Sequence, residues 1–146
     1  MNAQKNIAMV LAGFFLLVSA TVVVAGDFDW TQQLNARAQS DLTGFKASLA
    51  ARFHVGDAEI RAVFNDVENP ADAYVVFRLG EMSSKSTDFV MGKYRSEKGK
   101  GWGALAKSLG VKPGSKEFHA LKRGADIEYI SGKSNRGKKS KNKGKG

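Results

Sequence analysis

Apolar residues through the centre of this 146-residue chain recur three and four positions apart, the spacing of helices with one buried face. No pair of segments alternates apolar and polar residues around a hairpin turn, so nothing in the sequence supports a sheet. We therefore expect an all-α fold, a compact bundle of about five or six short helices. No internal repeat is convincing in the sequence.

The first half of the body predicts three helices. Residues 30–53 carry one apolar stripe, weakened in the middle by Gly44 at a cost of roughly 1 kcal/mol relative to alanine. Asp57 is expected to cap the next helix. The pair Asn69 and Pro70 suits a helix start, because proline lacks an N–H that the first turn does not use. The helix that follows, about 71–82, is apolar nearly all round and should be the most buried element.

The second half predicts three shorter helices. Thr87 opens one of them, and a Gly/Lys run interrupts the pattern before Trp102 begins another. Gly110 suits a left-handed helix end, with the next apolar residue folding back. Ser115 is expected to cap a last helix that ends at Gly124. Residues 125–130 fit either a short strand or an irregular packing segment.

The N-terminal 25 residues have the pattern of a secretory signal peptide. A short positive region containing Lys5 precedes an uncharged run of 19 residues, from Ile7 to Ala25. Val23 and Ala25 are small enough for signal peptidase, which predicts cleavage before Gly26. An uncleaved membrane anchor stays open, because about 20 apolar residues can span a bilayer. The sequence predicts export to the periplasm or beyond, with the rest of the chain membrane-anchored if the signal is kept.

The chain contains no cysteine. This excludes disulfides, thiolate nucleophiles, Cys-ligated zinc, iron–sulfur clusters and attachment of a lipid to cysteine. In an oxidising compartment the exported domain, residues 26–130, must therefore be stabilised by its apolar core alone.

Charge divides the chain into three parts. Residues 26–91 hold six basic and ten acidic residues, a net charge of −4, and residues 92–130 hold nine and four, a net charge of +5. Residues 131–146 hold seven basic residues, no acidic residue and no apolar side chain, which predicts a disordered tail. The predicted polyanion-binding residues are Lys133, Arg136, Lys138, Lys139, Lys141, Lys143 and Lys145.

No pattern of a known catalytic, metal or cofactor site is present. The chain lacks a nucleophile elbow and an H-E-x-x-H zinc motif, and the glycines of 99–103 have the spacing of neither nucleotide fingerprint. We expect Gly101 and Gly103 to let the backbone approach closely beside Trp102. His54 and His119 are isolated and are expected to be structural or solvated. The sequence therefore predicts a non-enzyme without cofactor or metal.

Residues 99–122 carry the strongest local signal. Their L-A-K-S-L-G-V segment resembles the first helix and turn of a helix-turn-helix, but Lys116 occupies a position where that motif has an apolar residue. The alternative is a compact helical hairpin that only packs the core. The predicted partner or core residues, with Trp102 expected at the packing centre, are Trp102, Leu105, Leu109 and Phe118.

Residues 98–115 read K-G-K-G-W-G-A-L-A-K-S-L-G-V-K-P-G-S. Together with the helix and Tyr-Arg element before it, this segment resembles a family of small exported bacterial proteins. The hallmarks of that family are the motif K-G-x-G-W-G-x-[LI]-A-x-x-L-G-[VI]-x-P-G-S and a Gly/Lys-rich C-terminal tail. The resemblance implies export and a helical fold, and it transfers no catalytic residue.

These observations together predict an exported, non-catalytic helical protein that binds polyanions mainly through its cationic tail. The expected partners are anionic envelope polymers, lipid headgroups or nucleic acid, bound by counterion release and without sequence preference. Two alternatives stay open. One is a helical module that binds another protein of the cell envelope, and the other is a divergent helix-turn-helix nucleic-acid binder.

Overall fold

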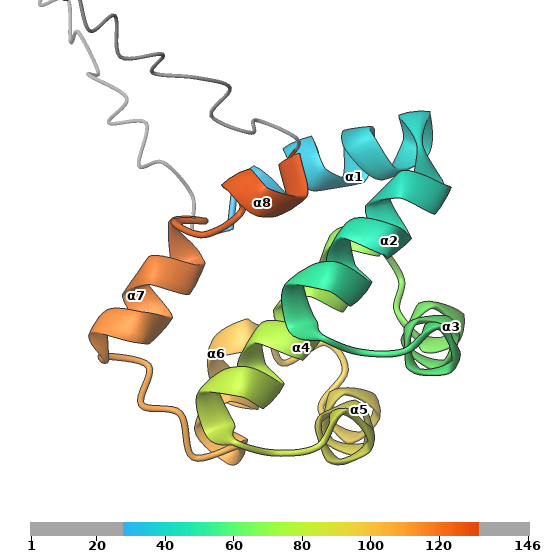
Figure 1. Cartoon of the computed structure of the whole chain (residues 1–146). Helices are drawn as coiled ribbons and strands as arrows, with labels where there is room; N and C mark the ends of the chain where they lie inside the picture. The colour runs from blue at the N-terminus through green and yellow to red at the C-terminus, as the bar shows by residue number, and fades with distance from the viewer. Residues whose placement is uncertain (1–27, 132–146) are drawn as a thin grey trace, which may run out of the picture.

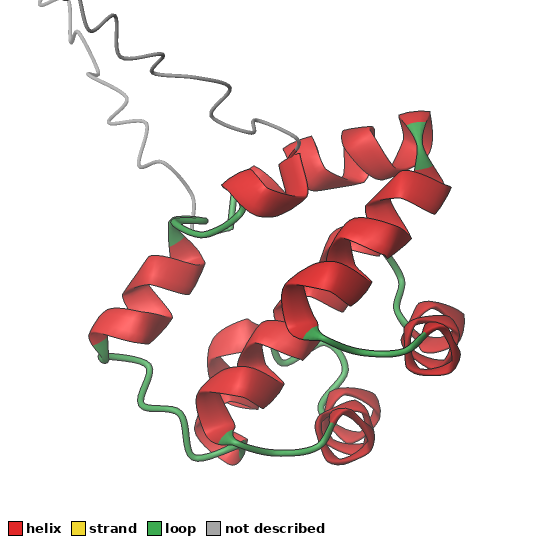
Figure 2. Cartoon of the chain, in the orientation of Figure 1, coloured by secondary structure: helices red, strands yellow, loops and turns green. Residues whose placement is uncertain are grey.

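The computed structural model describes residues 28–131, which form helices joined by short turns, with no strand in that range (Figures 1 and 2). The predicted all-α class is confirmed for this part of the chain, with seven helices of seven or more residues and a final helix of four. In chain order they are α1 (Trp30–Ser40), α2 (Leu42–Phe53), α3 (Asp57–Asp66), α4 (Pro70–Ser83), α5 (Thr87–Ser96), α6 (Trp102–Ser108), α7 (Lys116–Lys122) and α8 (Glu128–Ser131).

The segment 30–53 is two helices and not one. The backbone leaves the helical region at Asp41, where φ is −152°, and the Asp41 carboxylate then caps α2 by accepting the N–H of Gly44 at 2.7 Å. A Cβ on Gly44 would collide with that carboxylate. Gly44 therefore makes room for the cap of α2, and the break comes three residues before it.

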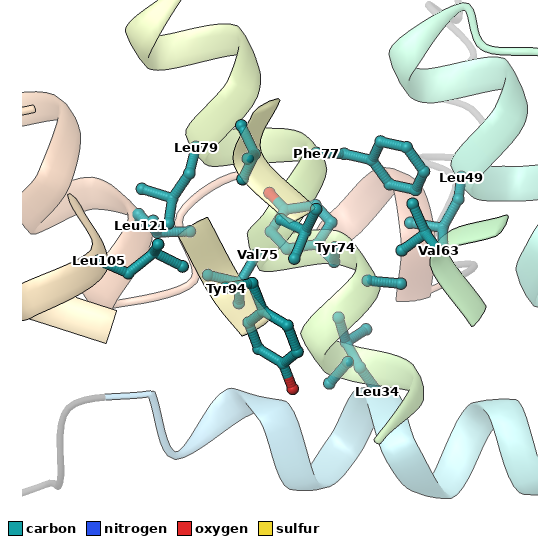
Figure 3. Packing of buried hydrophobic residues seen from close by; sticks show 14 of the residues in the cluster. Leu34, Leu49, Val63, Tyr74, Val75, Phe77, Leu79, Tyr94, Leu105 and Leu121 are labelled. Atoms are coloured by element: carbon teal, nitrogen blue, oxygen red, sulfur yellow. The ribbon is translucent and has the colours of Figure 1, made fainter. Parts of the chain in front are cut away.

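Helix α4 lies at the centre of the bundle and is the most buried element, as predicted. Helices α1, α2, α3, α5 and α7 all pack against it. Pro70 is its first residue, and the carboxylate of Asp72 accepts the backbone N–H of Asn69 at 3.1 Å, closing a capping box before the apolar run begins. Figure 3 shows Tyr74, Val75 and Leu79 from this helix among buried side chains from the helices around it.

Helices α2–α3 and α4–α5 are two hairpins of the same design. Each has a three-residue turn, whose first residue, His54 or Ser84, is left-handed with φ of 56° or 53°. Helices α3 and α5 both have ten residues and begin 30 residues apart. Figure 1 shows α2 and α4 side by side and α3 and α5 both viewed end-on. This relation was not predicted from the sequence.

Trp30 connects α1 to the end of α7. Its side chain is 6% exposed, and its Nε1–H donates to the carbonyl oxygens of Leu121 at 3.0 Å and Lys122 at 3.1 Å. The ring also packs edge-on against Tyr74, with the centroids 5.3 Å apart. The packing centre predicted at Trp102 is therefore wrong, because Trp30 fills the core and Trp102 is only half-buried.

The remaining ends of helices are explained by local chemistry. Gly56, in an extended conformation, precedes α3, so Asp57 is the first residue of that helix and not its cap. Ser115 caps α7 by accepting the N–H of Phe118 at 3.2 Å, as predicted. The ambiguous segment 125–130 forms turns and the start of α8, with Ile130 buried.

The structure has no helix within residues 28–131 that is long and apolar enough to cross a membrane. The predicted signal peptide, the cleavage point before Gly26 and all of the predicted tail except Ser131 lie outside the described residues.

Candidate functional site

The four residues predicted as partner or core residues fall into two groups. Leu105, Leu109 and Phe118 are buried in the apolar core, at 3%, 4% and 2% exposure. Trp102 lies at the edge of that core, half-buried, at the first residue of α6. Of these four side chains, only Trp102 therefore presents a substantial surface to a ligand or partner.

The glycines before α6 are required for their backbone conformation. Gly99 and Gly101 have φ of 86° and 83°, a left-handed region that residues with a side chain rarely adopt. A Cβ on Gly101 or Gly103 would meet nothing within 4 Å apart from the neighbouring residues in the chain. No other segment therefore packs closely against these two glycines, and the expected close approach of the backbone beside Trp102 is wrong. The loop folds back on itself, with the N–H of Lys100 donating to the carbonyl of Glu97 at 3.0 Å.

The end of α6 confirms the predicted left-handed cap. Gly110 has φ of 81°, and the N–H of Val111 returns to the carbonyl of Ala106 at 2.9 Å, with the Val111 side chain buried. Seven residues then separate Ser108, the end of α6, from Lys116, the start of α7.

Neither the helix-turn-helix nor the compact helical hairpin predicted for residues 99–122 agrees with the packing of α6 and α7. A helix-turn-helix joins its two helices by a turn of about three or four residues, shorter than the linker between α6 and α7. Helix α6 packs mainly against α5, and α7 packs against α4. Figure 1 shows α7 at the edge of the molecule, on the side away from α3.

Trp102 forms one wall of a cavity of about 300 Å³. The start of α4, the end of α5, the loop 97–101 and the start of α6 surround this cavity. Tyr94 of α5 stacks on Trp102, with the ring centroids 5.7 Å apart and the planes 21° from parallel. Leu105 supplies an apolar part of the lining.

Carboxylates outnumber cations around this cavity. Glu68, Asp72 and Glu97 line it together with one ammonium group, that of Lys98. Lys98 Nζ lies 2.9 Å from Glu68 Oε1, and that hydrogen bond raises the pKa of the lysine. Asp72 and Glu97 form no ion pair with a residue of the described range, so the cavity carries an excess of negative charge.

Asp72 is the one charged side chain in the described residues that is classed as buried, at 9% exposure. Its burial raises the pKa of its carboxyl, against the opposing effect of the hydrogen bond from the N–H of Asn69. The hydroxyl of Tyr94 lies 3.5 Å from Asp72 Oδ2, and burial raises the pKa of that phenol as well. Asp72 was not predicted as a site residue, although Asn-x-x-Asp before an apolar run is a recognisable capping signal.

Positive charges without acidic partners gather in the segment 100–123. Five exposed cations there form no ion pair with any residue that the structure describes. They are Lys100, Lys107, Lys112, Lys116 and Arg123. The segment contains one acidic residue, Glu117.

The two histidines lie apart and exposed, His54 at the end of α2 and His119 on α7. Within residues 28–131 no group of three or more His, Asp or Glu side chains could hold a metal ion. The seven predicted polyanion-binding residues lie outside the described part of the chain.

Comparison of the chain with protein-family models, with curated proteins and with solved structures found no match.

Proposed function

We propose that this chain is an exported, non-catalytic helical protein that binds polyanions mainly through its basic C-terminal segment. The observation that carries the proposal is the composition of residues 132–146, which hold seven basic residues and no acidic or apolar one. Such a segment binds by releasing counterions from an anionic polymer, with an affinity that falls as salt rises. Gly, Ser and Asn between the charges let it match many phosphate or carboxylate spacings and select none.

The folded domain supports the same proposal from its own surface. The five exposed and unpaired cations of residues 100–123 precede the basic segment in the chain. In the acidic part of the domain, by contrast, Arg52 and Arg78 are both paired with Glu81. Residues 100–123 therefore offer a second, weaker contact for a polyanion beside the tail.

The test compares four forms of the mature chain that begins at Gly26. The first is unchanged, the second has all seven tail cations replaced by glutamine, and the third has the tail residues shuffled. The fourth ends at Ser131, because α8 ends there and the Ile130 beside it is buried, so no core residue is lost. Binding to DNA duplexes of two unrelated sequences and to vesicles with anionic lipid is measured against salt.

We expect the unchanged and shuffled chains to bind equally, whatever the duplex sequence, and to release as salt rises. Neutralising the tail should reduce the slope of log K against log salt by up to about 6 for duplex DNA, at about 0.9 per phosphate contact. Equal binding by the neutralised chain would refute the tail as the main contact. The variant Lys107→Gln/Lys112→Gln/Lys116→Gln, with Arg61→Gln as its control, would then show whether the domain surface binds instead. Absence of binding at low salt would refute the proposal.

A further inference from the structure

The cavity beside Trp102 and the basic tail differ in the charge that they present to a ligand. It is bounded by carboxylates and stacked aromatic rings, whereas the basic segment is rich in lysine. Any ligand of this cavity must therefore differ from the polyanions proposed above, and the two activities can be tested separately.

The carboxylate of Asp72 has one oxygen that is still available to a ligand. Asp72 Oδ2 accepts hydrogen bonds from the backbone N–H and the side-chain N–H of Asn69 and from the Tyr94 hydroxyl. Asp72 Oδ1 has no hydrogen-bond donor among the described residues. No cation pairs with it, although Asp72 is nine-tenths buried. Oδ1 is open to solvent, so a positively charged ligand in the cavity could donate a charge-assisted hydrogen bond to it and neutralise the carboxylate.

The rest of the lining selects the kind of cation. Aromatic rings attract cations, and Tyr94 and Trp102 both line this wall, although their stacking covers one face of each ring. Leu105 offers an apolar contact for a hydrocarbon stem. A metal ion is disfavoured, because no group of three or more acidic or histidine side chains in the described range is arranged to hold one.

We infer that the cavity between α4, α5 and α6 binds an alkylammonium group, with Asp72 as its counterion and Tyr94 and Trp102 against its carbon atoms. Glu97 adds negative charge at the same cavity, while the charges of Lys98 and Glu68 offset each other in their ion pair. A free amine and a lysine side chain, including one from the chain's own tail, share this chemistry.

The test is a titration of the isotope-labelled mature chain with n-pentylammonium, followed by NMR. We expect saturable shifts of the Trp102 indole N–H and of the Gly99 and Gly101 amides. The neutral isostere n-pentanol, added as a control, should bind at least tenfold more weakly, because it lacks the charge that strengthens the hydrogen bond to a carboxylate. Equal binding of both probes would overturn the inference and leave only an apolar hollow.

Asp72→Asn is the decisive variant, since its amide oxygen can still accept the N–H of Asn69 and its size is unchanged. It should bind n-pentylammonium roughly tenfold more weakly. Asp57→Asn removes an exposed carboxylate at the start of α3, outside the cavity, and should bind as the parent does. If Asp72→Asn melts early, Glu97→Gln at the same cavity is the second variant. Unchanged affinity in the folded variants would overturn the inference.

The chain with all seven tail cations replaced by glutamine identifies the source of the natural ligand. Tighter binding of n-pentylammonium by this chain would show that the tail's own lysines compete for the site. Unchanged binding would assign the site to a separate amine. Failure of polyanion binding leaves these results unaffected, and loss of the shifts in both chains would overturn the inference.

Discussion

Gly124 provides a stringent test of the packing around Trp30. It ends α7 with φ of 65°, and a Cβ at this position would lie 2.5 Å from Trp30 Cγ and 2.6 Å from Cδ1. Both neighbours belong to a ring that is buried and held by two hydrogen bonds, so neither can move away easily. Gly124→Ala therefore combines a strained backbone with a steric clash.

The two costs can be assigned separately. A left-handed conformation costs a residue with a side chain about 1–2 kcal/mol, and overpacking a well-packed core costs about 1–3 kcal/mol. Gly124→Ala should thus lower the free energy of unfolding by about 2–5 kcal/mol. Since about 1 kcal/mol shifts Tm by at least 4 °C in a domain of this size, Tm should fall by about 8 °C or more.

Two other glycines are matched controls. Gly110 has φ of 81° but open space around its Cβ position, so Gly110→Ala should cost only the backbone contribution, about 1–2 kcal/mol. Gly92 lies within α5 with open space and no positive φ, so Gly92→Ala should stabilise the domain by about 0.5–1 kcal/mol.

Urea denaturation of the mature chain, followed by circular dichroism, measures all three variants. If Gly124→Ala is no more destabilising than Gly110→Ala, the close contact with Trp30 is refuted. A double-mutant cycle sharpens the test, because a Trp30→Ala background removes the two closest contacts and leaves only the Cβ of residue 30, at 3.0 Å. In that background the cost of Gly124→Ala should fall towards that of Gly110→Ala.

Two further predictions rest on the structure, and a third rests on the sequence of the N-terminal segment. Trp30→Ala should lower the free energy of unfolding by about 3–5 kcal/mol, and Trp102→Ala should lower it by clearly less, because only the Trp30 ring is buried and hydrogen-bonded. Equal losses for the two variants in urea denaturation would contradict this prediction. Burial alone would raise the pKa of Glu81, but hydrogen bonds from two arginines lower it below its ordinary value of 4.5, so its stabilisation is present at neutral pH and is lost as pH falls through the lowered pKa. Because the carboxyl is half-exposed, Glu81→Gln should cost only about 0–1 kcal/mol at neutral pH and nothing once the carboxyl is protonated, as thermal melts at both pH values can show. Intact-mass measurement of the protein from its native cell should give a chain that begins at Gly26, and a chain that keeps the first 25 residues would support the membrane anchor.

The helices could be predicted because their causes are local. Serine before α7, proline at the start of α4 and glycine after α6 each act within one turn of the chain, and the apolar spacing is visible without any partner. The break at Asp41 was missed, because the apolar stripe continues across it while the capping hydrogen bond depends on a single carboxylate.

The site residues were harder to predict because their roles depend on contacts between residues that lie far apart in the sequence. Glycines on both sides of Trp102 suggested tight packing, but Gly101 serves a left-handed backbone, and no other segment packs closely against Gly101 or Gly103. The hydrogen bonds of Trp30 join residues 91 and 92 positions apart, and Asp72 meets Tyr94 across 22 positions. A local sequence pattern cannot predict contacts between residues that are this far apart in the chain.

The α2–α3 and α4–α5 hairpins resemble each other in structure although their sequences show no repeat. Counted from the left-handed turn residue, the position five before it is a buried leucine in both hairpins, Leu49 and Leu79. The position six after it is a buried β-branched residue in both, Ile60 and Val90. Other aligned positions, such as Ala50 and Gly80, differ in kind, so the similarity is lost in a residue-by-residue comparison. The two hairpins therefore share the left-handed turn residue and a buried apolar side chain at these two fixed distances from it, and not a repeat along their whole length.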